Sequence, residues 1–138
     1  MLDVLAIPGH EDASVAVYDR ATGILLSGDT LYPGRLYVRN WPAFAASAQR
    51  LVDFASTRVI THVLGAHIEQ ARTPYTDYER GTAYQPDEHE LALGRSHLLE
   101  WNDALVKANG VPAQIALRDF TIVPPQPPRA PRPSGGGQ

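Results

Sequence analysis

The sequence predicts an α/β fold in which helices cover one face of a mixed β-sheet. Three observations support this prediction: short apolar runs typical of strands, an amphipathic segment at residues 42–56, and an apolar, β-branched run directly after it at 59–65. A strand that follows a helix in this way is typical of a strand–helix unit on a buried sheet. The 138 residues suffice for one domain with a single core.

The first part of the chain is predicted to contain three strands. Residues 3–7 form an apolar run that a Pro-Gly pair ends. Residues 14–19 and 23–28 are two further apolar runs, and the short glycine-containing connection between them predicts an antiparallel hairpin. The last of these strands stops at Gly28-Asp29.

A helix is predicted after the turn-rich residues 30–39. Asn40 is a suitable N-cap, and Pro42 lies in the first turn, where a proline is tolerated. Apolar side chains then recur at positions i, i+4, i+7, i+8 and i+11, so they share one buried face. They are Phe44, Ala48, Leu51, Val52 and Ala55.

The second part of the chain is predicted to contain a long loop, a helix and a strand. Residues 68–86 have no usable period and predict the loop, which at this length is expected to be functional or mobile. The helix is expected to begin at Asp87, to contain Gly94 and to stop at Asn109-Gly110. Its buried face would carry Leu91, Leu98, Trp101 and Leu105. The strand is expected at 113–123, with Ile115, Leu117, Phe120 and Ile122 as core residues.

The chain is therefore divided into a folded domain, residues 1–123, and a Pro/Gly-rich tail, residues 124–138. Six of the twelve prolines fall in the tail, and this composition predicts an extended, disordered segment. The tail also contains PxxP sequences of the kind that polyproline-binding domains recognise. A disordered tail is the preferred interpretation.

Composition and charge exclude several classes of function. The net charge of −3, with no cluster of Lys and Arg, argues against nucleic acid or an anionic membrane as a partner. The absence of Cys excludes disulfides, thiolate metal ligands and a Cys nucleophile. No stretch approaches the length of a membrane span, and the N-terminus lacks the basic region of a signal peptide, so a cytoplasmic location is expected by default. That default would fail if a leader belonged to a preceding segment.

Polar side chains suited to metal binding follow three of the predicted strands. They are His10, Asp29 and His67. Because strand ends emerge along one rim of a sheet, these side chains are expected to lie together. Imidazole nitrogen and carboxylate oxygen both suit Zn²⁺, and a carboxylate can bridge two ions. Taken singly, each residue is more often an ordinary loop, turn or hydrogen-bonding residue than a metal ligand.

The remaining histidines are given structural interpretations. His62 sits within an apolar strand and is interpreted as a satisfied structural histidine. His89 and His97 are both placed on the second helix, about 80° apart around its axis, so they do not form a tight ligand pair. Substrate-side candidates are the polar and aromatic residues that flank His10 and His67. They are Glu11, Glu69 and Tyr84, with Arg72, Tyr75, Tyr78 and Glu88 nearby in the loop.

Four segments occur in a recognisable order: Pro8-Gly9-His10, the hairpin at 14–28, Gly28-Asp29-Thr30, and Gly65-Ala66-His67. In this order they resemble the second half of the metallo-β-lactamase superfamily, in which a later Gly-x-His closes the site. The resemblance covers about residues 3–70, and the order of elements continues to residue 123. The stretch from His67 to His89 is similar to a branch of bacterial members of undefined function.

The resemblance implies a parent fold of four layers, αββα, of which this chain is the C-terminal half. It implies His10 as a ligand of a first metal, Asp29 as a bridging carboxylate and His67 as a ligand of a second. Zn²⁺ is the expected metal, with iron or manganese as alternatives. The His-x-His-x-Asp-His motif of the first half is absent, so no catalytic residue is assigned. Glu11-Asp12 also departs from the Thr-containing loop of most members.

Two functions follow as hypotheses. The first is a metal-dependent hydrolase, inactive alone, whose missing N-terminal half comes from the same gene or a partner; its small-molecule substrate is not assigned. The alternative is a non-catalytic, truncated or self-associating module, such as a homodimer in which two copies mimic the two halves. Either hypothesis predicts an apolar sheet face that another polypeptide covers.

Overall fold

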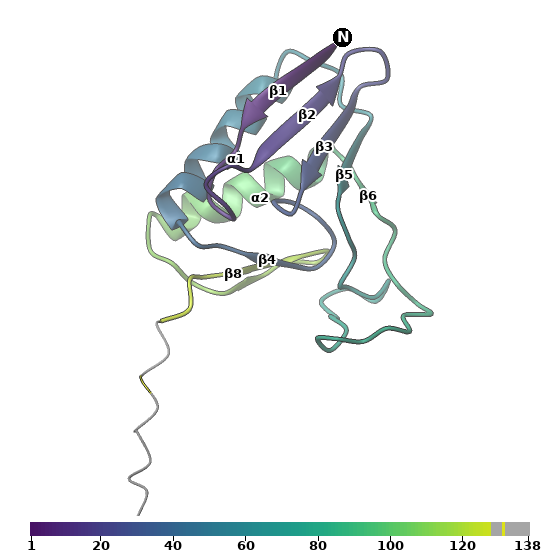
Figure 1. Cartoon of the computed structure of the whole chain (residues 1–138), viewed down its shortest axis with the longest axis vertical. Helices are drawn as coiled ribbons and strands as arrows, with labels where there is room; N and C mark the ends of the chain where they lie inside the picture. The colour runs from purple at the N-terminus through teal and green to yellow at the C-terminus, as the bar shows by residue number, and fades with distance from the viewer. Residues whose placement is uncertain (128–130, 132–138) are drawn as a thin grey trace, which may run out of the picture.

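The structure is a computed structural model that describes residues 1–127 and 131 (Figure 1). Within this part the chain forms two helices, α1 (Trp41–Ala55) and α2 (Arg95–Ala108), and two β-sheets. This confirms the predicted fold class. Neither helix in the described part has the length and apolar character needed to cross a lipid bilayer. Most of the predicted tail at 124–138 lies outside the described residues.

The larger sheet has five strands in the order β1-β2-β3-β5-β6. They are β1 (Leu2–Ala6), β2 (Val15–Asp19), β3 (Ile24–Gly28), β5 (His62–Gly65) and β6 (Ala92–Leu93). The predicted hairpin is the antiparallel pair β2–β3. β3 and β5 run parallel, with α1 between them in the sequence, which agrees with the strand–helix unit that was predicted. The pairs β1–β2 and β5–β6 are antiparallel, which makes the sheet mixed.

A smaller sheet lies at one end of the molecule, in the order β4-β8-β7 (Figure 1). Its strands are β4 (Arg35–Tyr37), β7 (Ile115–Ala116) and β8 (Thr121–Val123). The prediction of one strand over 113–123 is wrong, because the chain turns back at residues 118–119. A backbone hydrogen bond from Leu117 to Phe120 (2.9 Å) closes this turn. Residues 30–39 were expected to form turns, so β4 was not predicted.

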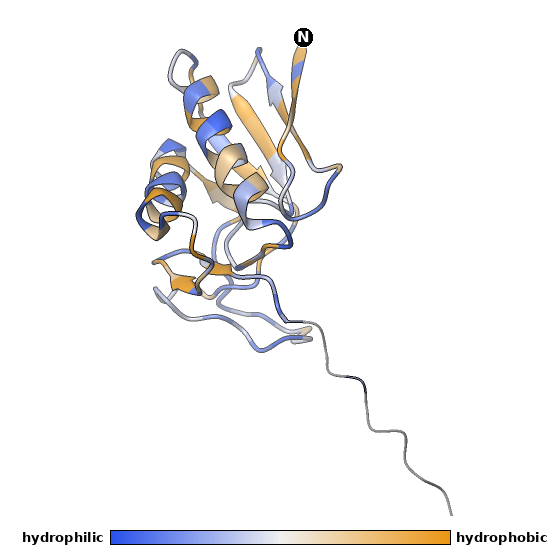
Figure 2. Ribbon diagram, turned by 90° about the vertical axis from the view of Figure 1, so that its left-hand side faces the viewer, coloured by the Kyte–Doolittle hydropathy of each residue, from blue (hydrophilic) through white to orange (hydrophobic). Residues whose placement is uncertain are grey.

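The core lies between the helices and the inner face of the larger sheet. Both helices lie on the same side of that sheet, as expected (Figure 2). Phe44 of α1 meets Trp101 of α2 edge to face, with ring centroids 5.2 Å apart. The predicted cap of α1 is confirmed, since Asn40 Oδ1 accepts a hydrogen bond from the Ala43 amide (3.1 Å). The predicted buried face of α1 is confirmed except at Val52, which is half-buried.

The second helix begins at Arg95, so the prediction that it begins at Asp87 is wrong. The chain before it is irregular and then pairs with β5 as the short strand β6. Gly94 is the extended N-cap residue of α2 rather than an interior residue, and its amide donates to His97 Nδ1 (2.9 Å). The helix ends as predicted at Asn109, which adopts a left-handed conformation. The predicted core residues of α2 are buried except Leu91, which lies outside the helix.

The outer face of the larger sheet is apolar and exposed, as expected. Successive side chains of a strand alternate between the two faces, so every second residue points away from the helices. The most exposed of these apolar side chains are Leu2 (61%), Val4 (66%), Val15 (49%) and Leu26 (46%). Part of this face forms a shallow apolar depression of about 300 Å³. His62, interpreted as a satisfied structural histidine within an apolar strand, is exposed at the start of β5.

Candidate metal centre

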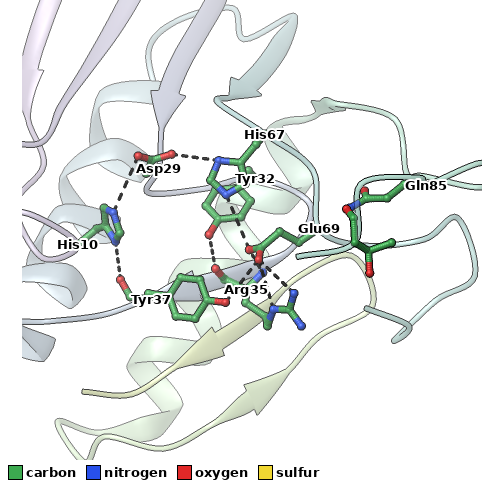
Figure 3. Close-up of polar contacts among 9 residues, drawn as sticks. His10, Asp29, Tyr32, Arg35, Tyr37, His67, Glu69 and Gln85 are labelled. Atoms are coloured by element: carbon green, nitrogen blue, oxygen red, sulfur yellow. Dashed lines mark hydrogen bonds and ion pairs between the residues drawn. The ribbon is translucent and has the colours of Figure 1, made fainter. Parts of the chain in front are cut away.

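The structure brings His10, Asp29 and His67 together at one rim of the larger sheet (Figure 3). Asp29 follows β3 and His67 follows β5, and these parallel strands end side by side, since Gly28 pairs with Gly65. β1 runs in the same direction as β3, because each is antiparallel to β2. The loop after β1 therefore carries His10 to the same rim.

The two oxygens of the Asp29 carboxylate face different histidines. Asp29 Oδ1 lies 3.2 Å from His67 Nδ1, and Asp29 Oδ2 lies 4.0 Å from His10 Nε2. About half of the Asp29 and His67 side chains is exposed, whereas that of His10 is mostly buried. The carboxylate is thus placed as a bridge between two separate imidazoles.

The ring of His10 is oriented by the small sheet. His10 Nδ1 lies 2.8 Å from the backbone carbonyl oxygen of Tyr37. A carbonyl can only accept, so Nδ1 carries the proton and Nε2 presents its lone pair toward Asp29. A partner of this kind on the far nitrogen is what fixes the tautomer of metal-ligating histidines.

Each histidine and the Asp29 oxygen that it faces form a pair of donors, here called a half-site, whose spacing is close to that of two ligands of one zinc ion. Two ligands bound at about 2.0–2.2 Å in a tetrahedral arrangement lie roughly 3.3–3.6 Å apart. The two histidine–carboxylate distances of 3.2 and 4.0 Å lie on either side of that range. Among the residues that the structure describes, no three His, Cys, Asp or Glu side chains are grouped to hold a single ion. Each half-site therefore has one imidazole and one carboxylate oxygen from this chain.

Glu69 lies next to His67 and forms an ion pair with Arg35. Glu69 Oε2 accepts from Arg35 Nη2 (3.1 Å) and from the Tyr37 hydroxyl (3.4 Å), and Oε1 accepts from the Arg35 amide (3.1 Å). Glu69 Oε1 also lies 3.8 Å from His67 Nε2. Less than a fifth of either the Arg35 or the Glu69 side chain is exposed. Of the substrate-side candidates, Glu69 is thus next to the predicted ligands, in a largely buried ion pair.

Tyr32 supports the other side of His67. The two rings are tilted against each other with centroids 4.2 Å apart, and the Tyr32 hydroxyl donates to the backbone oxygen of Arg35. Burial, with the nearby Glu69 carboxylate, raises the pKa of Tyr32 well above its usual value, so the phenol stays neutral. The close approach requires Gly65, because a Cβ there would lie 2.4 Å from Tyr32 Cβ.

The other two substrate-side candidates lie at the surface. Glu11 pairs with Arg39 (Nη1 to Oε2, 2.9 Å) in an exposed salt bridge. Tyr84 lies in the long loop with 80% of its surface exposed. Gln85, the next residue in the chain, is drawn in Figure 3 on the opposite side of Glu69 from Asp29.

A second cluster joins His89, His97 and Asp119, and the sequence prediction for it is wrong. His89 does not lie on α2, and both histidines contact the same carboxylate. His89 Nε2 lies 2.9 Å from Asp119 Oδ1, and His97 Nε2 lies 2.9 Å from Asp119 Oδ2. Burial raises the pKa of Asp119, but the hydrogen bonds from the two histidines outweigh it and hold that pKa below its usual value. The cluster ties the end of the long loop to α2 and to the β7–β8 turn.

Comparison with known proteins adds a partial match. No protein-family model matches the chain. Among curated proteins, it is similar to the acyl-coenzyme A thioesterase MBLAC2 of Gallus gallus, with 33% identity over 70 residues. The aligned segment covers 48% of this chain and 25% of the relative, so the chain matches only about a quarter of that protein's length. The match supports a relationship to hydrolases of the metallo-β-lactamase type.

Proposed function

We propose that this chain is part of a metal-dependent hydrolase of the metallo-β-lactamase superfamily, to which it contributes the ligands His10, Asp29 and His67. The observation that carries the proposal is the placement of Asp29, whose two carboxylate oxygens face a different histidine each, at 3.2 and 4.0 Å. Zn²⁺ suits this donor set, and iron or manganese remain alternatives.

Metal ions held by His10, Asp29 and His67 would lower the pKa of a coordinated water and polarise a substrate carbonyl. The chain's own residues hold the ligands in place for this. The Tyr37 carbonyl fixes the tautomer of His10, and Tyr32 fixes the ring of His67. Arg35 pairs with Glu69, so the carboxylate behind His67 adds no uncompensated charge to the site.

A thioester is the first substrate class to test. The similar protein from Gallus gallus is named as an acyl-coenzyme A thioesterase, and its similarity to this chain extends over 70 residues. A thioester carbonyl is also a group that a metal ion held by these residues would activate toward hydrolysis. We therefore propose hydrolysis of an acyl thioester to a carboxylic acid and a thiol.

The half-sites are incomplete within this chain, so we propose that a second polypeptide segment completes them. The apolar outer face of the sheet, with Leu2, Val4, Val15 and Leu26 exposed, ends at the same rim as the ligands. A covering sheet would bury that face and bring further ligands to the rim. This segment is the N-terminal half of a metallo-β-lactamase fold or, in the alternative function, a second copy of this chain.

The test is hydrolysis of acyl-coenzyme A, aryl ester and β-lactam substrates by zinc-loaded protein, with mass measurement by sedimentation velocity on the same sample. We expect any hydrolysis to be lost on chelation, restored by Zn²⁺ and lost in Asp29→Ala. His62→Ala is the matched control, because His62 is an exposed histidine of the same sheet outside the site. Hydrolysis that survives both chelation and Asp29→Ala contradicts the proposal, as does a monomer that binds no zinc.

A further inference from the structure

A polar cavity of about 480 Å³ lies beside the small sheet and is lined by none of the proposed metal ligands. Its walls come from β4, β8, the long loop and the segments around residues 114 and 126. It is lined by Arg35, Asp77, Arg80, Gln114, Thr121, Val123 and Gln126. This volume is within the range of cavities that enclose small molecules. Val123 is the only apolar side chain among the lining residues.

The charges of the cavity are separated rather than paired with each other. Arg35 is neutralised by Glu69, which lies 3.1 Å away. Arg80 is exposed and lies over the ring of Tyr37, 5.1 Å from its centroid, and within the described part of the chain it makes no ion pair. Among the described residues, Asp77 makes no ion pair with either arginine. One cationic group and one anionic group therefore line the cavity without a counter-ion.

Asp77 lines the cavity, and one oxygen of its carboxylate is buried without a partner. Its Oδ1 is buried and has no hydrogen-bond partner within the described part of the chain. A buried polar atom without a partner is costly, so native proteins normally supply one from the chain, a water or a ligand. Burial raises the pKa of Asp77 despite the opposing effect of Arg35, in keeping with a carboxylate short of donors.

We propose that this cavity binds a small zwitterion, namely a free amino acid with an uncharged polar side chain. The ligand's ammonium group would donate to Asp77, and its carboxylate would accept from Arg80, with the free edge of the Arg35 guanidinium alongside. Arginine suits this role, because its planar guanidinium matches a carboxylate with two parallel hydrogen bonds.

Charge balance favours a zwitterion over a simple ion. A ligand with one charge of each sign gives a partner to both Asp77 and Arg80. A simple anion would face the Asp77 carboxylate, and a simple cation would face Arg80, so either would meet one repulsive contact in a partly desolvated site. The amide groups of Gln114 and Gln126 and the Thr121 hydroxyl are neutral donors and acceptors, which suit an uncharged polar side chain on the ligand.

The experiment is a thermal-shift screen of the full chain against each of the standard amino acids, followed by calorimetric titration of the best binder, which we expect to have an uncharged polar side chain. We expect the N-acetyl form, which lacks the ammonium group, to bind at least about tenfold more weakly, which corresponds to the loss of one charged contact. The amide form, which lacks the carboxylate, should lose a similar factor. Backbone amide shifts of residues 114 and 121 should move with the parent amino acid.

Asp77→Asn and Arg80→Gln should each lose at least about tenfold in affinity, because each removes one of the two charges. Glu79→Gln is the matched control, since Glu79 is an exposed carboxylate of the same loop that does not line the cavity. Retained cooperative unfolding shows that the variants are folded. The proposal is overturned if no standard amino acid binds, if the blocked forms bind as well as the parent, or if Asp77→Asn and Arg80→Gln bind like the wild type. Zinc binding at His10, Asp29 and His67 is measured separately and does not depend on this result.

Discussion

Replacement of Asp119 by alanine removes the carboxylate that holds the long loop to α2. The wild-type side chain accepts two hydrogen bonds of 2.9 Å, from His89 and His97, and only 16% of it is exposed. A hydrogen bond to a charged group contributes about 1.5–3 kcal/mol to stability, and partial exposure favours the lower end of that range. We therefore expect Asp119→Ala to lower the free energy of unfolding by about 3 kcal/mol.

Asp119→Asn should cost much less, because the amide can keep both contacts. His97 Nδ1 accepts from the Gly94 amide, so its Nε2 carries the proton and can donate to an amide oxygen. His89 donates from both ring nitrogens when it contacts the Glu90 carbonyl (2.7 Å from Nδ1) and Asp119; opposite an amide, the ring with a proton on Nδ1 alone can accept at Nε2 from the amide nitrogen. Only the charge of the pair is lost, so we expect a cost of about 1 kcal/mol.

The difference in the free energy of unfolding between the wild type and Asp119→Asn should depend on pH. The hydrogen bonds from the histidines hold the folded-state pKa of Asp119 below its unfolded value. The stabilisation is then fully present above the unfolded pKa, near 3.9, and is lost as the pH falls through the folded pKa. The two proteins should therefore approach equal stability in strong acid.

The assay is urea unfolding of the wild type, Asp119→Ala and Asp119→Asn near neutral pH and at about pH 3. Amide exchange in the long loop should show faster opening in Asp119→Ala, since the His89 amide also donates to the Gln70 carbonyl (2.8 Å) within that loop. Exposed Asp103→Ala is the matched control, because its salt bridge to Lys107 lies at the surface and contributes little. Equal stability of the wild type and Asp119→Ala at neutral pH would refute the reasoning.

Three further substitutions test the packing around the site and the sheet. Gly65→Ala should cost about 1–3 kcal/mol in urea unfolding, because the new Cβ would lie 2.4 Å from Tyr32 Cβ, and unchanged stability would contradict this contact. Asn40→Ala should lower the free energy of unfolding by about 1 kcal/mol in thermal unfolding, because it removes the cap on the Ala43 amide. A loss no larger than that of an exposed α1 substitution such as Gln49→Ala would contradict this role of the cap. Leu26→Lys should change the free energy of unfolding by less than about 0.5 kcal/mol while reducing self-association in light scattering, and undiminished association would show that the outer face is not the contact.

The elements set by local patterns could be predicted from the sequence. The α1 helix follows from its apolar period and its Asn40 cap, and the β2–β3 hairpin follows from two apolar runs around a glycine-containing turn. The meeting of Asp29 and His67 follows from the parallel pairing of β3 and β5, because their ends emerge at one rim. Such features depend on neighbours in the sequence or on a simple topology.

The features that were missed depend on contacts between distant segments. Arg35 and Glu69 are 34 residues apart, and nothing in their spacing indicates a pair. Asp119 was placed in a strand and His89 in a helix, so their contact could not be foreseen. The early start predicted for α2 has the same origin, since residues before Gly94 are held by pairing of β6 with β5 rather than by a helical period.

The central claim is that His10, Asp29 and His67 hold metal, and calorimetric titration of the purified chain with Zn²⁺ tests it most directly. We predict saturable binding in the wild type that is lost in Asp29→Ala, because Asp29 contacts both histidines, and that is retained in His62→Ala. Zinc binding of equal affinity and stoichiometry in the wild type and Asp29→Ala would contradict the claim, as would the absence of zinc binding in the wild type.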